Sequence, residues 1–266
     1  MPKENKMSKF KLPEKGTIRD EIREALKTVQ RGGDFLDDFS DESSYFREDG
    51  WIHWRGPYSQ EQVHLPLTHQ PQIHPVKGIK LRVTTNPENA RIVARIVSLI
   101  CEKNNIYYKL AEGLAGYKSF EGNVQKGKFA VIFPDVENAP RIAKELDQTL
   151  LSIGLRKESD IKTPISDIPI GDSGLVSFRY TGNSGEDRDK VIFHTKYEGK
   201  IKKVYFPNRL MRENPFSKLE SVISRYILKT AQGIDNQDEA DFRARLIYGL
   251  MSRKIEEFKK RFYELR

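Results

Sequence analysis

Three short segments alternate apolar and polar residues, and each has positive charge on its polar side. Successive side chains of a strand point to opposite faces, so the apolar residues of such a segment face a core and the charged residues share the other face. The charged residues are Lys80 and Arg82 in the first segment, Lys109 in the second and Arg179 in the third. Clustered like charges are costly unless an anion joins them. If the three segments lie in one sheet, they predict a phosphate-binding face.

Each of these residues also has a purely structural interpretation, which the sequence leaves open. Lys80 and Arg82 could form a solvated strand face, and Lys109 could be an ordinary surface lysine. Arg179 could be the partner of a structural ion pair. The functional interpretation requires all four side chains to converge, which depends on the elements that position them.

The expected elements form an α+β fold with a mostly antiparallel sheet, flanking helices and a C-terminal helical extension. Asn86-Pro87-Glu88 is a strong helix start, because it combines a cap, a first-turn proline and an acid near the positive end of the helix dipole. The expected helices are 17–32, 86–103, 136–153, 216–232 and 237–265, and the expected strands are 63–65, 79–85, 106–110, 128–133, 175–180, 190–195 and 201–206.

We expect three regions along the chain. Residues 1–48 read as a basic disordered tail and an N-terminal helix, residues 49–215 as the α+β domain, and residues 216–266 as C-terminal helices packed on that domain. Within these regions, 34–48 is expected to be a loop with weak helical content, 51–75 a loop-rich segment and 155–174 a loop. The apolar stripe of the last helix could instead form an oligomer contact.

The composition favours an anionic partner. The 266-residue chain has a net charge of +8, which suits nucleic acid, an acidic membrane surface or a phosphorylated protein. We expect a soluble protein, because no segment reaches the length of a membrane span and the N-terminus lacks a signal peptide's apolar core. The single cysteine, Cys101, excludes an intrachain disulfide, and its apolar surroundings predict a buried thiol.

Four histidines lie between Trp51 and Pro75, but their spacing argues against a metal site. His53, His64, His69 and His74 have no spacing of the HExxH kind, and no cysteine accompanies them. We therefore expect no metal and no cofactor.

Several segments together resemble one known family. The stretches that carry the resemblance, in order, are Lys80-Leu81-Arg82-Val83-Thr84-Thr85, Tyr107-Tyr108-Lys109, Gly127-Lys128-Phe129, Ser177-Phe178-Arg179-Tyr180 and Arg212-Glu213-Asn214-Pro215-Phe216. Over roughly residues 75–220 the chain resembles the phosphothreonine lyases secreted by bacterial pathogens, the OspF/SpvC family, and the related N-terminal lyase domains of class III and IV lanthipeptide synthetases.

The resemblance implies β-elimination of phosphate from phosphothreonine or phosphoserine, without a metal or a cofactor. Lys109 would be the base that removes the α-proton, and Lys80 and Arg179 would hold the phosphate. A lysine with its ordinary pKa of about 10.4 is a poor base at neutral pH, but neighbouring cations and partial burial lower the pKa of such a group.

The chain departs from the family pattern where the general acid is expected. Arg82 stands in place of a histidine, and an arginine does not release a proton at ordinary pH. His64 and His74 are the candidate replacements for the acid, and Lys126 and Arg188 are the candidates for further phosphate contacts. An impaired lyase, a lyase with altered chemistry and a phosphopeptide-binding module are all compatible with these changes.

The expected partner is a phosphorylated protein or peptide, either turned over or only bound. A basic segment with an apolar pair, Lys6–Leu12, resembles docking peptides for mitogen-activated kinases, so such a kinase is one candidate partner. The alternative of a nucleic-acid-binding protein lacks a recognised fingerprint. An effector would be secreted into a host cell, whereas an enzyme of peptide maturation would be cytoplasmic.

Overall fold

The computed structural model describes most of the region in which the site was expected. The residues described are 20, 38–48, 50–54, 56, 78–112, 128–158, 163, 167–187, 190–207, 219–229 and 237–265. Three predicted features lie outside them: the basic N-terminal tail with its docking-like segment, nearly all of the helix 17–32, and the short strand 63–65.

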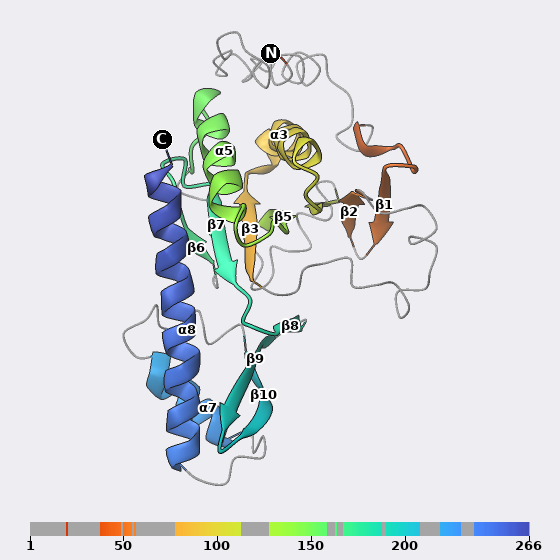
Figure 1. The fold of residues 1–266 in the computed structure, drawn as a ribbon. Helices are drawn as coiled ribbons and strands as arrows, with labels where there is room; N and C mark the ends of the chain where they lie inside the picture. Colours follow the sequence, from red (N-terminus) through yellow and green to blue (C-terminus); the bar gives the residue numbers. More distant parts are fainter. Residues whose placement is uncertain are drawn as a thin grey trace.

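A seven-stranded sheet is the centre of the fold (Figure 1). Its strand order is β1-β2-β4-β5-β3-β7-β6, and every pairing between neighbours is antiparallel. The strands are β1 Tyr45–Glu48, β2 Trp51–Trp54, β3 Ile79–Thr84, β4 Tyr108–Ala111, β5 Lys128–Ile132, β6 Ile168–Pro169 and β7 Val176–Tyr180. The predicted α+β class with an antiparallel sheet is confirmed.

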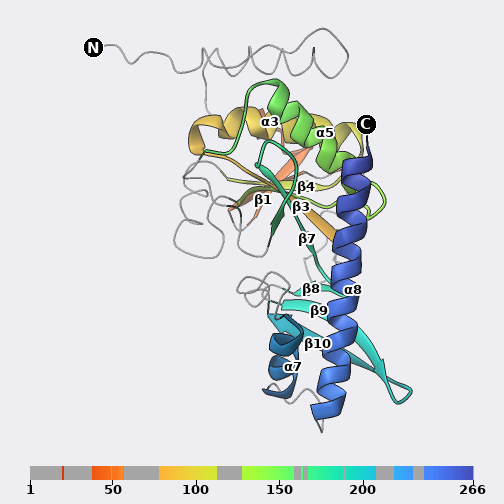
Figure 2. The ribbon, with the colours of Figure 1, turned by 90° about the vertical axis from the view of Figure 1, so that its left-hand side faces the viewer.

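Two helices cover one face of this sheet (Figure 2). They are α3, Ala90–Lys103, which follows the short 3-10 helix η3, Pro87–Asn89, and α5, Ala139–Ser152. The buried aliphatic residues of β3, Ile79, Leu81 and Val83, belong to the core. The predicted cap at Asn86 is present, since its side-chain oxygen accepts a 3.0 Å hydrogen bond from the Asn89 N–H.

The later strands form a second sheet, which the sequence pattern did not separate from the first. Its order is β10-β9-β8, with β8 Gly185–Asp187, β9 Lys190–Tyr197 and β10 Lys200–Pro207. The helices α7, Leu219–Lys229, and α8, Gln237–Glu264, follow. Helix α8 runs alongside both sheets (Figure 1). Its Phe258 stacks on Phe178 of β7 at 4.1 Å between ring centroids, and its Phe242 lies 5.4 Å from Tyr197 of β9.

The apolar stripe of α8 packs partly on its own chain. Phe258 and Phe262 are buried, whereas Phe242 and Leu246 are each 42% exposed. The structure thus shows intramolecular packing for one part of the stripe and leaves the proposed oligomer contact untested.

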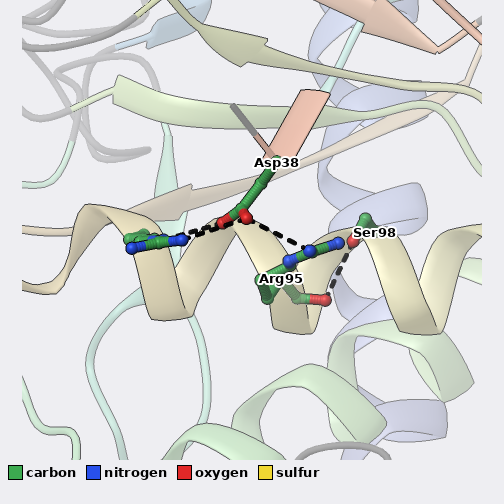
Figure 3. Close-up of polar contacts among 4 residues, drawn as sticks. Asp38, Arg95 and Ser98 are labelled. Carbon is green, nitrogen blue, oxygen red and sulfur yellow. Dashed lines mark hydrogen bonds and ion pairs between the residues drawn. The ribbon is translucent and has the colours of Figure 1, made fainter. Parts of the chain in front are cut away.

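The segment before β1 is attached to α3 by ion pairs (Figure 3). The Asp38 carboxylate lies 2.8 Å from Nε of Arg91 and 3.2 Å from Nη2 of Arg95. Phe39 is buried beside them. The segment 34–48, which was expected to be a loop, contains strand β1 at its end, and the segment 51–75, which was expected to be loop-rich, begins with strand β2. Trp51, Ile52 and His53 are all buried, so β2 lacks the alternation that marks a half-buried strand.

Three predictions from composition can be compared with the described residues. Cys101 is buried in α3, as expected, and burial raises the pKa of its thiol well above the ordinary value. None of the described helices is both long and apolar enough to cross a membrane. The described residues also contain no group of three or more potential metal ligands.

Candidate functional site

Lys80 and Arg179 lie directly opposite each other on neighbouring strands. The β3–β7 register pairs Lys80 with Arg179 and Arg82 with Ser177, so these four side chains share one face of the sheet. That face is the one opposite Leu81 and the other core residues of β3. We call it the cationic face, defined by Lys80, Arg82, Lys109 and Arg179.

Both ends of the β3–β7 pair are fixed by threonines. At one end, Thr84 donates from its N–H (2.9 Å) and its hydroxyl (3.1 Å) to the Leu175 carbonyl. At the other end, Thr181 donates from its N–H (2.7 Å) and its hydroxyl (2.8 Å) to the Gly78 carbonyl. These contacts hold the register, which matters because a slip of one residue would turn Arg179 to the opposite face.

Lys109 lies on the same face, two strands away from Arg82. The pairings Lys109 with Val131 and Val131 with Arg82 place all three residues in one row across β4, β5 and β3. Two strand spacings separate the backbones of Lys109 and Arg82 by about 10 Å. Val131 and its neighbour Phe133 form the apolar floor between them, and both are buried.

Asp167 joins two of the cations. Its carboxylate lies 3.1 Å from Nη1 of Arg82 and 3.8 Å from Nε of Arg179. The side chain of Asp167 is 0% exposed, and those of Arg82 and Arg179 are 5% and 7% exposed. Sequence analysis missed this residue, because it lies in a segment without strand or helix periodicity. Asp167 thus brings one negative charge to this group of four cations.

The two lysines of the cationic face lie over aromatic rings. The Nζ atom of Lys109 is 4.6 Å from the centroid of the Trp51 ring, and that of Lys80 is 5.2 Å from the Phe133 ring. Such contacts favour the charged ammonium and restrict its position. Both lysines remain partly exposed, in contrast to Arg82 and Arg179.

A histidine lies beside Lys109 that was not among the sequence-based candidates for the acid. His53 of β2 is the cross-strand partner of Lys109 of β4 and is 4% exposed. Its Nδ1 atom lies 2.5 Å from the Tyr107 hydroxyl, and its ring stacks on Phe46 at 4.6 Å. The sequence did not reveal that the strand of His53 pairs with the strand of Lys109, so His53 was not recognised as a neighbour of the base.

The hydroxyl of Ser177 also belongs to the cationic face. Ser177 is 1% exposed, and its Oγ atom has no hydrogen-bond partner among the described residues. A buried hydroxyl without a partner is costly, so this group is available to a ligand that reaches Arg82, its cross-strand neighbour.

Four of the sequence-predicted site residues lie outside the described part of the chain. These are the candidate acids His64 and His74 and the candidate phosphate contacts Lys126 and Arg188. Their roles stay predictions. The structure places the other four, Lys80, Arg82, Lys109 and Arg179, on one face.

Solved structures of phosphothreonine lyases are among the proteins similar to this chain. The lyase OspF from Shigella flexneri is 14% identical, with a TM-score of 0.35, over 62% of this chain and 91% of that one. The virulence protein SpvC from a Salmonella plasmid is 12% identical, with a TM-score of 0.35, over 64% and 89%. Another phosphothreonine lyase structure is 13% identical, with a TM-score of 0.40, over 61% and 86%. These scores are too low to support a shared mechanism.

The comparison with protein families gives a more specific result. No sequence among the curated proteins matches the chain. Residues 43–197, however, match the family described as RamC, N-terminal domain. The matched segment contains the whole seven-stranded sheet and all four residues of the cationic face. It makes up more than half of the chain, which therefore belongs to the RamC N-terminal domain family.

Proposed function

We propose that the protein eliminates phosphate from phosphothreonine or phosphoserine in a protein or peptide. In this proposal Lys109 removes the α-proton, and Lys80, Arg82 and Arg179 bind the phosphate. The observation that carries it is the placement of all four side chains on one sheet face, with Lys80 and Arg179 directly opposite each other. Substrate, partner and location in the cell remain part of the proposal.

The charges of the cationic face support phosphate binding. Four cations lie on this face and Asp167 brings one negative charge to two of them, which favours the approach of an anion such as phosphate. Guanidinium groups bind phosphate oxygens with directed, charge-assisted hydrogen bonds, and Asp167 holds two of them in place. The Ser177 hydroxyl can donate one more hydrogen bond to the same group.

The position of Lys109 supports proton abstraction. The α-carbon of a bound phosphothreonine lies a few bonds from its phosphorus, which fits a base on β4 and a phosphate site on β3 and β7 with an apolar floor between them. In the step itself, the Cα–H electrons form the Cα=Cβ bond while the Cβ–O bond breaks. Lys109 gains the proton, and the phosphate leaves with the electrons of the Cβ–O bond.

Two observations favour a second candidate, a module that binds phosphopeptides without turnover. Arg82 stands where the resemblance to the lyases puts the acid, and it is paired with Asp167; as an arginine it cannot protonate the leaving phosphate. The Trp51 ring under Lys109 also stabilises the ammonium form, which is not the basic one. Such a module would have the same charges but no route for the proton.

The mass of a phosphothreonine peptide after incubation with the protein separates these functions. Elimination gives a product that has lost the elements of phosphoric acid and contains a dehydro residue. A peptide that binds but keeps its mass supports the binding module. A product that regains its hydroxyl is that of a phosphatase and contradicts both proposals.

The variant Lys109→Ala tests the base. We expect elimination to fall by at least about 10²-fold, because no base then reaches the α-proton, while the phosphopeptide still binds. The control Lys260→Ala removes an exposed lysine of α8 and should leave both properties unchanged. Full turnover by Lys109→Ala would show that another group is the base.

A further inference from the structure

We infer that the hydroxyl of Tyr107, held by His53, protonates the leaving phosphate in place of Arg82. This inference rests on the proposed elimination and supplies the step that the site otherwise lacks. The hydrogen phosphate dianion is a much better leaving group than the fully deprotonated ion, so the departing oxygen needs a proton donor. The phenol of Tyr107 and the imidazole of His53 are both side chains that can donate a proton in this role.

Tyr107 lies next to β4, the strand of the base, in the row of residues that crosses β5 to Lys80 of β3. Tyr107 directly precedes β4 and is two residues before Lys109, so the side chains of both residues point to the cationic face. The Phe133 N–H donates a 3.0 Å hydrogen bond to the Tyr107 carbonyl, and the two rings lie 5.4 Å apart. On its other side Phe133 lies under the ammonium of Lys80. Tyr107, Phe133 and Lys80 thus form one continuous row.

His53 acts as a positioning residue in this arrangement. Its ring is fixed by stacking on Phe46 and by burial, and its Nδ1 atom lies 2.5 Å from the Tyr107 oxygen. With the proton on Nδ1, the imidazole donates to that oxygen and stabilises the phenolate that forms when Tyr107 gives up its proton. The charged groups of this face are Lys109 on β4, Lys80 and Arg82 on β3, Arg179 on β7 and Glu48 on β1, with Asp167 beside the two arginines.

The protons balance over one turnover. The α-proton moves to Nζ of Lys109, the Cβ–O bond breaks, and the Tyr107 proton moves to the departing oxygen to give hydrogen phosphate. The protein is left with an ammonium at Lys109 and a phenolate at Tyr107. Transfer of one proton between them through solvent restores the starting state, so no further reactant is needed.

The pH dependence of elimination tests this assignment. We measure kcat with a phosphothreonine peptide across neutral and alkaline pH for the wild-type chain, Tyr107→Phe and His53→Phe. The wild type should lose activity at high pH, where the phenol is already deprotonated. Tyr107→Phe should be slower by about 10²–10⁴-fold and lack that alkaline loss. His53→Phe should also be slower, and its alkaline loss should move to higher pH, because the phenolate has lost a hydrogen-bond donor.

Matched substitutions on the exposed surface serve as controls. Tyr263→Phe and His194→Phe change the same residue types at exposed positions of α8 and β9 and should behave as wild type. Wild-type rates in Tyr107→Phe, or lower rates with an unchanged pH profile, would overturn the inference while leaving the proposed elimination intact. A wild-type chain that eliminates no phosphate at any pH would overturn the proposed function, and this inference with it.

Discussion

Asp167 supplies negative charge to the cationic face when no ligand is bound. It is the carboxylate that contacts both Arg82 and Arg179, and its side chain is fully buried. A buried cation that loses its partner is strongly destabilising, typically by about 3–5 kcal/mol. The same carboxylate competes with phosphate for the two guanidinium groups. Asp167 therefore stabilises the fold and weakens anion binding at the same time.

The variant Asp167→Asn should separate these two effects. We expect its melting temperature to be several degrees below that of the wild type, because Arg82 and Arg179 lose their countercharge. Added inorganic phosphate should then raise the melting temperature of the variant more than that of the wild type, because the anion replaces the lost charge. Thermal unfolding with and without phosphate measures both quantities. An equal response of the two proteins would place the phosphate elsewhere.

At the residue scale, sequence reasoning found the cations and missed their companions. Strand alternation was enough to put Lys80 and Arg82 on the polar side of one strand and Arg179 on the polar side of another, because each alternates with apolar neighbours. That the two strands pair and share this face came from the structure. Asp167 and His53 gave no such signal. Asp167 comes from an aperiodic segment, and His53 comes from a strand whose residues are buried on both faces.

At the scale of elements, the loop before β7 is fixed to α5. The carboxylate of Asp147 accepts hydrogen bonds from the N–H groups of Asp172 (3.0 Å) and Ser173 (2.9 Å). Gly171 has a φ of +82°, and a Cβ there would meet the Asp147 carboxylate at 2.2 Å. The close approach of this loop to α5 fixes the start of β7 and thereby the position of Arg179 along that strand.

The variant Gly171→Ala should disrupt this attachment, with Gly199→Ala as its control. Both glycines have positive φ, but a Cβ at Gly199 meets nothing within 4 Å. We expect about 1 kcal/mol of destabilisation for Gly199→Ala from backbone strain, and roughly 1–3 kcal/mol more for Gly171→Ala from the clash. Denaturant unfolding measures the difference. An equal loss of unfolding free energy in the two variants would mean that the loop can move away from Asp147 without a cost in stability.

The sequence predicted most of the elements and less of their arrangement. Helices α3, α5 and α8 and strands β3, β4, β5 and β7 lie close to the predicted ranges, since caps, glycines and periodicity are local signals. Local signals do not reveal which strands pair. The position of β5 between β4 and β3, and the separate β8–β10 sheet, follow from long-range packing instead.

At the scale of the whole molecule, the net charge of +8 should assist binding of a phosphopeptide. Salt screens the attraction between exposed charges and a distant ligand, whereas it screens the contacts of the buried residues Arg82 and Arg179 less. We therefore expect the association rate to fall as salt is raised from about 0.05 to about 0.5 M, with a smaller change in the dissociation rate. Stopped-flow binding at several salt concentrations measures both rates. A dissociation rate that rises as steeply as the association rate falls would indicate binding on the exposed surface.

The central claim is that the cationic face recognises a phosphoryl group, and paired peptides test it most directly. Calorimetric titration of the Lys109→Ala variant with a phosphothreonine peptide and with the same peptide carrying threonine compares the two affinities without turnover. The account predicts that the phosphorylated peptide binds at least about tenfold more tightly, or about 1.4 kcal/mol, and that Lys80→Ala in the same background abolishes the difference. Equal affinities for the two peptides would contradict it.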